Sequence, residues 1–233
     1  MIPPTSIDGT DITGATIDGT DVQEITVDGD VVFSAATIID DFESGNINNY
    51  GGDTGNFSVS STNVISGSNS LEGVNIGSTN YIHSTSGLAN YPSAGDKFSF
   101  KFKVDGSVDS ISGIVFGVQN TVTNNYVVHY SMQAGFGGFF SIRKNASTSS
   151  RGSILQRNDF GTPNNNVHRV EINWGTNGLI DCDVFDDDSN NLLGSVSATD
   201  TDYTSGGIGW FTDDSSGGVS DPSAVVFDDA KII

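Results

Sequence analysis

The sequence of 233 residues contains one cysteine, so an intramolecular disulfide is excluded. A chain of this length buries roughly 70% of its unfolded surface and can be stable without a covalent cross-link. Cys182 lies where apolar and polar residues alternate, and we expect it to be a buried small hydrophobic residue. The three histidines lie far apart and have no second ligand at the spacing of a zinc site. The sequence therefore favours neither a disulfide scaffold nor a zinc centre.

Basic residues are also scarce. The chain has nine lysines and arginines and 29 aspartates and glutamates, which gives a net charge of −20. A field of this sign repels phosphate backbones, so we expect no nucleic-acid binding. Self-repulsion of this size destabilises a compact chain, whereas a Debye length of about 3 Å in 1 M salt screens it. The charge therefore favours a halophilic setting, and a calcium-rich extracellular setting is the alternative.

Long apolar runs are missing. No stretch approaches the roughly 20 apolar residues of a membrane span, so we expect no membrane insertion. The chain begins Met1-Ile2-Pro3-Pro4, without the basic and apolar regions of a secretory signal peptide. We therefore expect the protein to stay in the cell or to leave it by another route, for example in an assembled particle.

Short runs with alternating apolar residues recur between clusters of turn-forming residues, and helical periodicity is absent. This pattern is typical of a β-sandwich or barrel. In the segment 97–104, Phe98, Phe100 and Phe102 share one face of the predicted strand, and lysines occupy the other. The sequence predicts an all-β protein whose main body is an antiparallel jelly-roll β-sandwich.

Residues 6–34 contain a repeat of ten residues, in which Ile-Asp-Gly or Val-Asp-Gly begins at Ile7, Ile17 and Val27. Asp-Gly is a preferred dipeptide of tight β-hairpins, so each repeat predicts a small hairpin. We place a β-hairpin repeat module at residues 1–36 and the sandwich at 37–233. Isolated hairpins are marginal in water, so we expect Ile7, Ile17 and Val27 to lie in an anchoring or oligomerisation contact, most simply a homotrimer. The alternative is that the module packs onto its own sandwich.

The residue patterns of common enzymes are not found. The four glutamates are isolated, although a retaining glycosidase needs two carboxylates about 5 Å apart. No nucleophile elbow, phosphate loop or His-Glu-x-x-His motif occurs. Asp181 and Asp183 share a strand face, which we interpret as a solvated acidic surface. We therefore expect the protein not to be an enzyme.

Carboxylates cluster at both ends of the predicted sandwich. Asp41 and Glu43 open it, and Asp228 and Asp229 close it. The first and last strands of a jelly roll commonly lie side by side, which would bring these carboxylates together. A hard cation relieves the repulsion of clustered carboxylates, and Ca²⁺ takes six to eight oxygen ligands. We predict a structural Ca²⁺ site at these four residues. The alternative is that strand alternation points half of them outward and nothing binds.

Aromatic side chains that stack on sugar rings are the remaining candidates for a binding site. Most of the tyrosines and both tryptophans lie in apolar strand patterns and are expected in the core. From the segment 124–130 we predict that Tyr126 and Tyr130 face a ligand, with Asn125 as a polar partner.

The segment from Ile39 to the end resembles the concanavalin-A-like, laminin-G-like jelly-roll superfamily as it occurs in haloarchaeal and viral proteins. The matching pieces are Asp41–Gly45, Val167–Trp174, Leu192–Ala198, Gly206–Trp210 and Phe227–Ala230. The resemblance implies a binding module for glycans or protein surfaces. Several members of the superfamily also carry a structural calcium where the first and last strands meet. Ligand identity does not transfer with the fold, because binding depends on loops.

Residues 1–36 resemble the short repeats at the start of tail and other virion proteins of phages and haloarchaeal viruses, above all at Asp21–Gly29. This implies a virion structural or adhesion protein of a halophilic archaeal virus, such as a tail fibre, a receptor-binding protein or a capsid decoration. The implied location is the virion surface. The implied partners are other virion proteins and a glycan or glycoprotein of the host surface. The alternative is a cellular carbohydrate-binding module or a surface-layer accessory protein.

Overall fold

A computed structural model of the chain describes residues 6–7, 10–11, 16–17, 20–21, 24–27, 30–34, 36–74, 79–105, 110–133, 137–160, 165–213 and 224–233. The chain divides into two compact units, Met1–Thr37 together with Ile233, and Ile38–Ile232. None of the described residues belongs to a helix with the length and apolar character needed to cross a bilayer.

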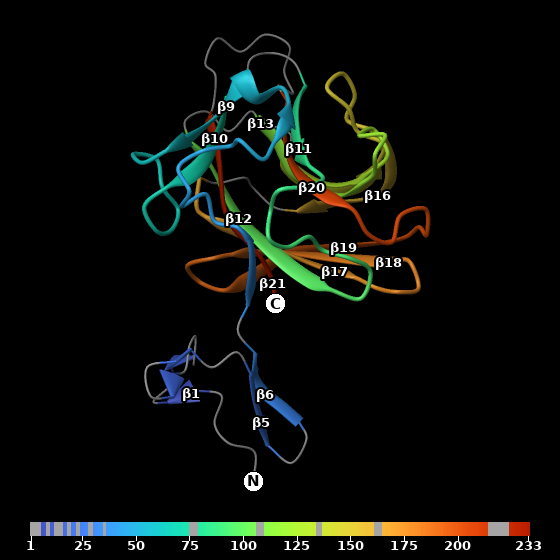
Figure 1. Ribbon diagram of the computed structural model, residues 1–233. Coiled ribbons are helices and arrows are strands. Elements are labelled where there is room, and N and C mark those ends of the chain that lie inside the picture. The colour runs from blue at the N-terminus through green and yellow to red at the C-terminus, as the bar shows by residue number, and fades with distance from the viewer. Residues whose placement is uncertain are drawn as a thin grey trace. The chain divides into compact units, whose positions relative to one another are not determined.

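The second unit consists of two antiparallel sheets, which form separate layers in Figure 1. Sheet I has the strand order β19 (Asn191–Thr199), β18 (Leu179–Asp186), β17 (His168–Trp174), β12 (Lys97–Asp105), β21 (Ala224–Ile232), β10 (Ser70–Val74) and β9 (Phe57–Ser60), and β7 (Thr37–Asp40) also pairs with β21. Sheet II has the order β16 (Ser153–Phe160), β15 (Gly137–Lys144), β14 (Tyr126–Gln133), β13 (Ser110–Val118), β20 (Gly207–Asp213), β11 (Asn80–Ser84) and β8 (Gly51–Gly52). The only described helix is a single 3₁₀ turn, η1 (Thr54–Asn56).

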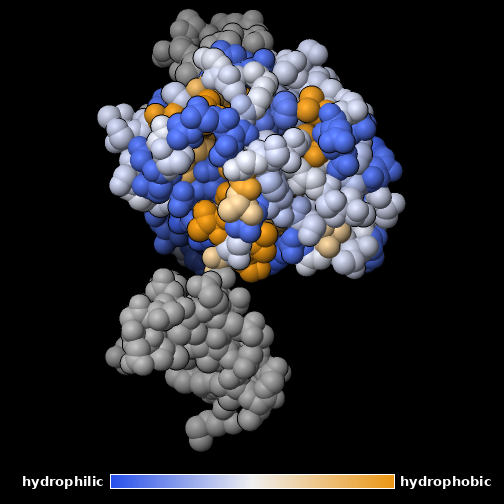
Figure 2. Space-filling model, in the orientation of Figure 1, coloured by the Kyte–Doolittle hydropathy of each residue, from blue (hydrophilic) through white to orange (hydrophobic). Residues whose placement is uncertain are grey.

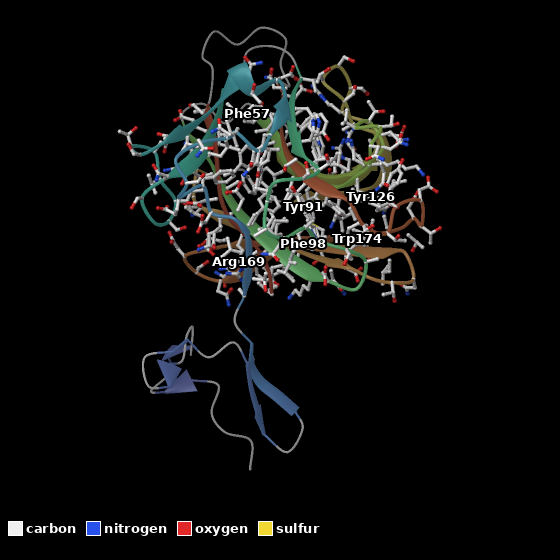
Figure 3. All side chains as sticks on the ribbon, in the orientation of Figure 1. Phe57, Tyr91, Phe98, Tyr126, Arg169 and Trp174 are labelled. Atoms are coloured by element: carbon white, nitrogen blue, oxygen red, sulfur yellow. The ribbon has the colours of Figure 1, made fainter. Side chains whose placement is uncertain are left out.

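The main hydrophobic core lies between the two sheets. Phe98, Phe100 and Phe102 of β12 are at most 2% exposed, as their alternation with lysines predicts. Phe98 and Trp174 lie in this core in Figure 3. Cys182 of β18 is also buried there and has no disulfide partner. The prediction of an all-β antiparallel jelly-roll sandwich is confirmed.

The outer face of sheet II, which points away from this core, is also largely buried. Its apolar residues form a second cluster, made of Tyr81, Ile111, Val115, Val118, Val127, Ala146 and Phe211, with Val122 packed against it. The loop 119–125 contributes to the cover, because the Tyr81 hydroxyl donates to the carbonyl oxygen of Val122 at 3.2 Å. A hydrogen bond from the backbone N–H of Ala146 to Asn125 Oδ1 joins this loop to the loop 145–152. Sheet II is therefore a central layer that is covered on both sides.

The described residues of the first unit form three antiparallel strand pairs. They are β1 (Ser6–Ile7) with β2 (Thr10–Asp11), β3 (Thr16–Ile17) with β4 (Thr20–Asp21), and β5 (Glu24–Val27) with β6 (Asp30–Ser34). The three Asp-Gly dipeptides that separate the paired strands lie outside the described residues. The side chains of Ile7, Ile17 and Val27 lie outside the described part as well, so their predicted role in oligomerisation stays a prediction.

Candidate functional site

A pocket of about 300 Å³ lies at one end of sheet II, where β11, β20 and β13 are neighbours. We call it the loop-end pocket. Its lining consists of Thr85, Tyr91, Val118, Gln119, Asn120, Ser205, Gly206 and Gly207. These residues come from the end of β13, the start of β20 and the loops next to the neighbouring strands. The lining is thus neutral, and it presents hydroxyl, amide and backbone groups beside one aromatic ring.

Two consecutive glycines allow the strands at the pocket to approach closely. Gly206 has a φ of +147°, and a Cβ there would lie 2.6 Å from the carbonyl oxygen of Val118. A Cβ on Gly207 would lie 2.1 Å from the carbonyl oxygen of Ser84. Real Cβ atoms do not approach oxygen so closely, so a side chain at Gly207 would push β20 away from β11. The Gly-Gly dipeptide therefore determines the shape of the pocket wall.

Hydrogen bonds hold the walls of the pocket in place. Gln119 Nε2 donates to the carbonyl oxygens of Gly117 and Ser205, at 2.8 and 2.6 Å. The Tyr91 hydroxyl is 2.8 Å from Ser84 Oγ and accepts the backbone N–H of Leu88 at 3.1 Å. These contacts fix the lining before any ligand arrives. The exposed amide of Asn120 has no hydrogen-bond partner among the described residues, so it is available to a ligand.

A second polar site lies on the outer face of sheet II. Ile142 of β15 points into the core, so Ser141 and Arg143 on either side of it point outward. Arg143 is joined there by Arg151 from the loop 145–152 and by Arg157 from β16. We call these three residues the arginine cluster.

Each member of the arginine cluster has a different environment. Arg151 forms an ion pair with the buried carboxylate of Asp213, at the end of β20. The guanidinium carbon of Arg157 lies 3.7 Å from the ring centre of Phe139, a cation–π contact, and its Nη2 is 2.9 Å from the exposed Asp159.

Arg143 itself is half-buried. Its Nε donates to Ser141 Oγ and its Nη1 to the carbonyl oxygen of Gly152, both at 3.1 Å. Burial, followed by the charges of Arg151 and Arg157, lowers its pKa, although the charge of Asp213 acts in the opposite direction. Among the described residues, no carboxylate forms an ion pair with Arg143.

His129 of β14 is fully buried beside this cluster. Its Nδ1 is 3.3 Å from Ser141 Oγ, and its ring packs against Phe139 and Phe211. Burial lowers its pKa well below the ordinary value, and the arginine cluster lowers it further. The ring is therefore neutral at pH 7. Among the described residues nothing hydrogen-bonds its Nε2, and Ser131 Oγ on the same strand face is also without a partner.

The outer face of sheet I has a different chemistry, because its charges pair with one another. Arg169 marks this face in Figure 3. A chain of ion pairs at 2.6–3.7 Å crosses the sheet through Lys97, Glu171, Arg169, Asp187, Lys101, Asp229 and Lys231. Burial alone would raise the pKa of Glu171, but Lys97 and Arg169 hold it below the ordinary value.

A shallow groove of about 450 Å³ lies beside these charges, between β17, β18 and β19. Asp181 and Asp183 line it, and they accept hydrogen bonds from Ser197 and Ser195 respectively. This arrangement fits the predicted solvated acidic face. It has no aromatic side chain for a sugar ring.

The predicted ligand-facing residues are wrong. Tyr126, Tyr130 and Asn125 are at most 2% exposed, so none of them can contact a ligand at the surface. Asn125 Nδ2 donates to the carbonyl oxygens of Val122 and Ala146, and the Tyr126 hydroxyl donates to Asp200 Oδ1 at 2.7 Å. Both contacts tie loops to sheet II. Tyr126 and Tyr130 are structural because their strand, β14, is covered on both faces, and Asn125 is structural because it joins two loops.

At the end of the sandwich, β7 and β21 do pair, as the calcium prediction requires. The carboxylates there are, however, already engaged in hydrogen bonds and ion pairs with other groups of the protein. Asp228 is fully buried, and its Oδ2 accepts from the backbone and the hydroxyl of Ser66 at 2.9 and 3.2 Å and from the hydroxyl of Ser70 at 2.7 Å. Burial raises the pKa of Asp228 despite these bonds. Asp229 pairs with Lys231 at 3.0 Å.

The other two predicted calcium ligands are also engaged. Glu43 Oε1 accepts the backbone N–H groups of Ser68 and Asn69 at 2.8 and 3.0 Å, and Asp41 Oδ1 accepts the N–H of Glu43 at 3.2 Å. No group of three or more His, Cys, Asp or Glu residues in the described part of the chain has the geometry of a metal site. The predicted ligands therefore do not fit a calcium ion. Serine and backbone donors relieve the carboxylate repulsion instead.

The sequence contained signals for both sites that residue patterns alone did not single out. Gly206-Gly207 stands at the start of a strongly apolar strand, and glycine in a strand indicates a close approach of another backbone. Three of the four arginines fall within 15 residues, in a chain with a net charge of −20. Such local concentration of a rare residue type indicates a cationic patch.

No protein-family model matches the chain, and no curated protein matches its sequence. Solved structures match its fold. A protein described as "Cellulose induced protein, Cip1" has a TM-score of 0.50 and 19% identity over 83% of this chain and 95% of that one. The exoplasmic/lumenal domain of VIP36, in a Ca²⁺-bound form, has a TM-score of 0.50 and 12% identity over 82% of this chain and 89% of that one.

A mutant of the GH43 protein BlXynB from Bacillus licheniformis also has a TM-score of 0.50, with 14% identity. The match covers 83% of this chain but only 38% of that one. At these identities the similarity shows the fold alone. The second unit of the chain therefore shares its antiparallel β-sandwich fold with these solved domains.

Proposed function

We propose that the second unit is a non-catalytic carbohydrate-binding domain and that the loop-end pocket holds a sugar residue. The observation that carries this proposal is the neutral polar lining of a pocket of about 300 Å³ around Tyr91. Sugar-binding sites combine a few fixed hydrogen-bonding groups with an apolar or aromatic surface. The pocket has this combination, in a fold that many glycan-binding domains share.

The chemistry of the lining matches that of a sugar. An amide such as Asn120 offers both donors and acceptors, which suits a ring of hydroxyl groups that do both. The walls held by Gln119 are already ordered, so binding a sugar requires little further ordering of the loop. Calcium has no part in this proposal, because the carboxylates predicted to hold it are bonded within the protein.

A blocking substitution tests the pocket. Asn120 is exposed on a loop, so Asn120→Trp fills the pocket without disturbing the core. Thr123→Trp places the same ring on the same loop, outside the pocket lining, and is the matched control. On an array of neutral and acidic glycans, we expect Asn120→Trp to abolish binding that the wild-type chain and Thr123→Trp retain. Equal binding by both variants would contradict the assignment of the pocket.

We further propose that the chain is an adhesion protein on the virion surface of a halophilic archaeal virus, where residues 1–36 dock to other virion proteins or oligomerise. A glycan or glycoprotein of the host surface would be the ligand. The support for this context is the ten-residue repeat and the net charge of −20. A cellular carbohydrate-binding module or a surface-layer accessory protein would use the same pocket. Mass spectrometry and immunogold labelling of purified virions separate these contexts, because only the first places the protein on the particle.

A further inference from the structure

We infer that the arginine cluster is a subsite for the anionic group, carboxylate or sulfate, of an acidic glycan. This inference rests on the proposed carbohydrate-binding function and names the class of sugar. The two sites are structurally linked. The loop 119–125 lines the loop-end pocket, and the hydrogen bond from Ala146 to Asn125 joins it to the loop 145–152 that carries Arg151.

The distribution of charge is the first support. On the outer face of sheet I, arginine and lysine alternate with carboxylates in a chain of ion pairs. On the outer face of sheet II the guanidinium groups of Arg151 and Arg157 lie near enough to that of Arg143 to add to the effect of burial in lowering its pKa. Only two of the three have an ion-pair partner among the described residues, Arg151 with Asp213 and Arg157 with the exposed Asp159. The Asp213 carboxylate offsets part of the repulsion between these like charges, and an anionic ligand at Arg143 would relieve more of it.

The geometry of Arg143 is the second support. Its contacts to Ser141 and Gly152 hold the guanidinium in one orientation and engage Nε and Nη1. Arginine has five N–H groups in a planar fork, which suits the bidentate recognition of a carboxylate or sulfate. The remaining N–H groups of Arg143 are therefore positioned to bind an anionic group.

Unpartnered buried groups lie on the same face. His129 Nε2 and Ser131 Oγ are buried and have no hydrogen-bond partner in the described residues. Both residues are 0% exposed, so they do not contact a ligand, and the arginine side chains alone form the proposed subsite.

Isothermal titration of the full chain with three probes tests this inference. The probes are a galacturonic acid oligosaccharide, a sulfated dextran oligosaccharide and the uncharged dextran oligosaccharide. We expect at least one of the acidic probes to bind about tenfold more tightly than the neutral one, because bonds to ionised groups are the stronger ones. Preference for the uronate or for the sulfate distinguishes the two sources of negative charge. Equal affinity for all three probes would overturn the inference.

Substitutions test whether the anionic group of the glycan binds at the arginine cluster. Arg143→Gln removes the charge but keeps a polar side chain, and we expect it to lower the affinity for the preferred acidic probe about tenfold. Arg169→Gln removes the same charge from the outer face of sheet I, so it is the matched control and should leave the affinity within about twofold. Arg157→Gln alters an exposed residue and keeps the test decisive if Arg143→Gln does not fold. Unchanged affinity in the cluster variants would overturn the inference.

The failure of the inference and that of the proposed function are distinguishable. If Asn120→Trp abolishes binding while Arg143→Gln does not alter acidic affinity, the pocket binds sugar and the anionic subsite is wrong. If acidic probes depend on Arg143 but not on Asn120, the anionic subsite stands and the pocket assignment is wrong. If no saccharide binds the wild-type chain, both are wrong.

Discussion

At the scale of single residues, the buried histidines make the stability of the fold depend on pH. His168 of β17 is 1% exposed and stacks on Phe102 of β12, with ring centres 5.3 Å apart. Burial lowers its pKa to about 4, although the charge of Asp186 acts in the opposite direction. The folded state therefore keeps this ring neutral at a pH where an unfolded chain would protonate it.

We expect acid to destabilise the protein through His168. The folded pKa lies below the unfolded value of about 6.5, so the unfolded state binds more protons and stability falls as the pH drops from about 6.5 towards 4. At pH 5 the loss amounts to about 2 kcal/mol for one such histidine. Urea unfolding at pH 7 and pH 5 should show a smaller loss for His168→Gln than for the wild type. An equal loss in both would refute the role of His168.

At the scale of elements, the close approach of β11 and β20 shapes the loop-end pocket. These strands pair in register from Asn80 with Thr212 to Ser84 with Ile208. Gly207 begins β20 at the point where a side chain would collide with the Ser84 carbonyl. The glycine therefore couples the pairing of two strands to the shape of the pocket.

We expect Gly207→Ala to destabilise the fold by about 3 kcal/mol, because the added methyl group forces the strands apart. The same substitution at Gly55, where a Cβ meets nothing within 4 Å, is the matched control and should change stability by less than about 1 kcal/mol. Thermal and urea unfolding of the two variants measure the difference. Two equally stable variants would show that β20 shifts without cost.

The strands of the core were predictable, but the site was not. Phe98, Phe100 and Phe102 alternate with lysines, and burial of one face follows directly from that pattern. The strand of Tyr126 and Tyr130 carries Val127, His129 and Ser131 on its opposite face, and these are buried as well, so alternation of polarity did not tell the core face from the outer one. The partners of Asp228, and the pairing of Arg151 with Asp213, join segments that are distant in sequence and leave no local signal.

At the scale of the whole molecule, ion pairs neutralise only a small part of the negative charge. The acids exceed the basic residues by 20, so most carboxylates face solvent or serine and backbone donors. The surface in Figure 2 is accordingly dominated by hydrophilic residues, with hydrophobic residues in small separate patches. Net repulsion, rather than loss of individual ion pairs, should therefore govern the response to salt.

We expect the midpoint of thermal unfolding to rise between about 0.1 and 2 M potassium chloride, because screening reduces this repulsion. Differential scanning fluorimetry or calorimetry across this range provides the measurement. A midpoint that does not change with salt would contradict the halophilic interpretation of the charge.

We also expect residues 38–232 to fold without the first unit, since they form a separate compact unit with its own core. If the first unit is the assembly element, the truncated protein is monomeric and the full chain is oligomeric. Light scattering coupled to size-exclusion chromatography decides this. An identical oligomeric state for both would assign assembly to the sandwich.

Sheet II, covered on both faces, also has a consequence for the entropy of binding. Strands β13, β14 and β20 at its centre are shielded from water on both sides, so their amide hydrogens should exchange with solvent among the slowest in the chain. Each loop of the two proposed sites begins or ends on this rigid layer, and some do both. A ligand would therefore immobilise few groups that are not already ordered, and exchange in these strands should stay nearly the same when it binds.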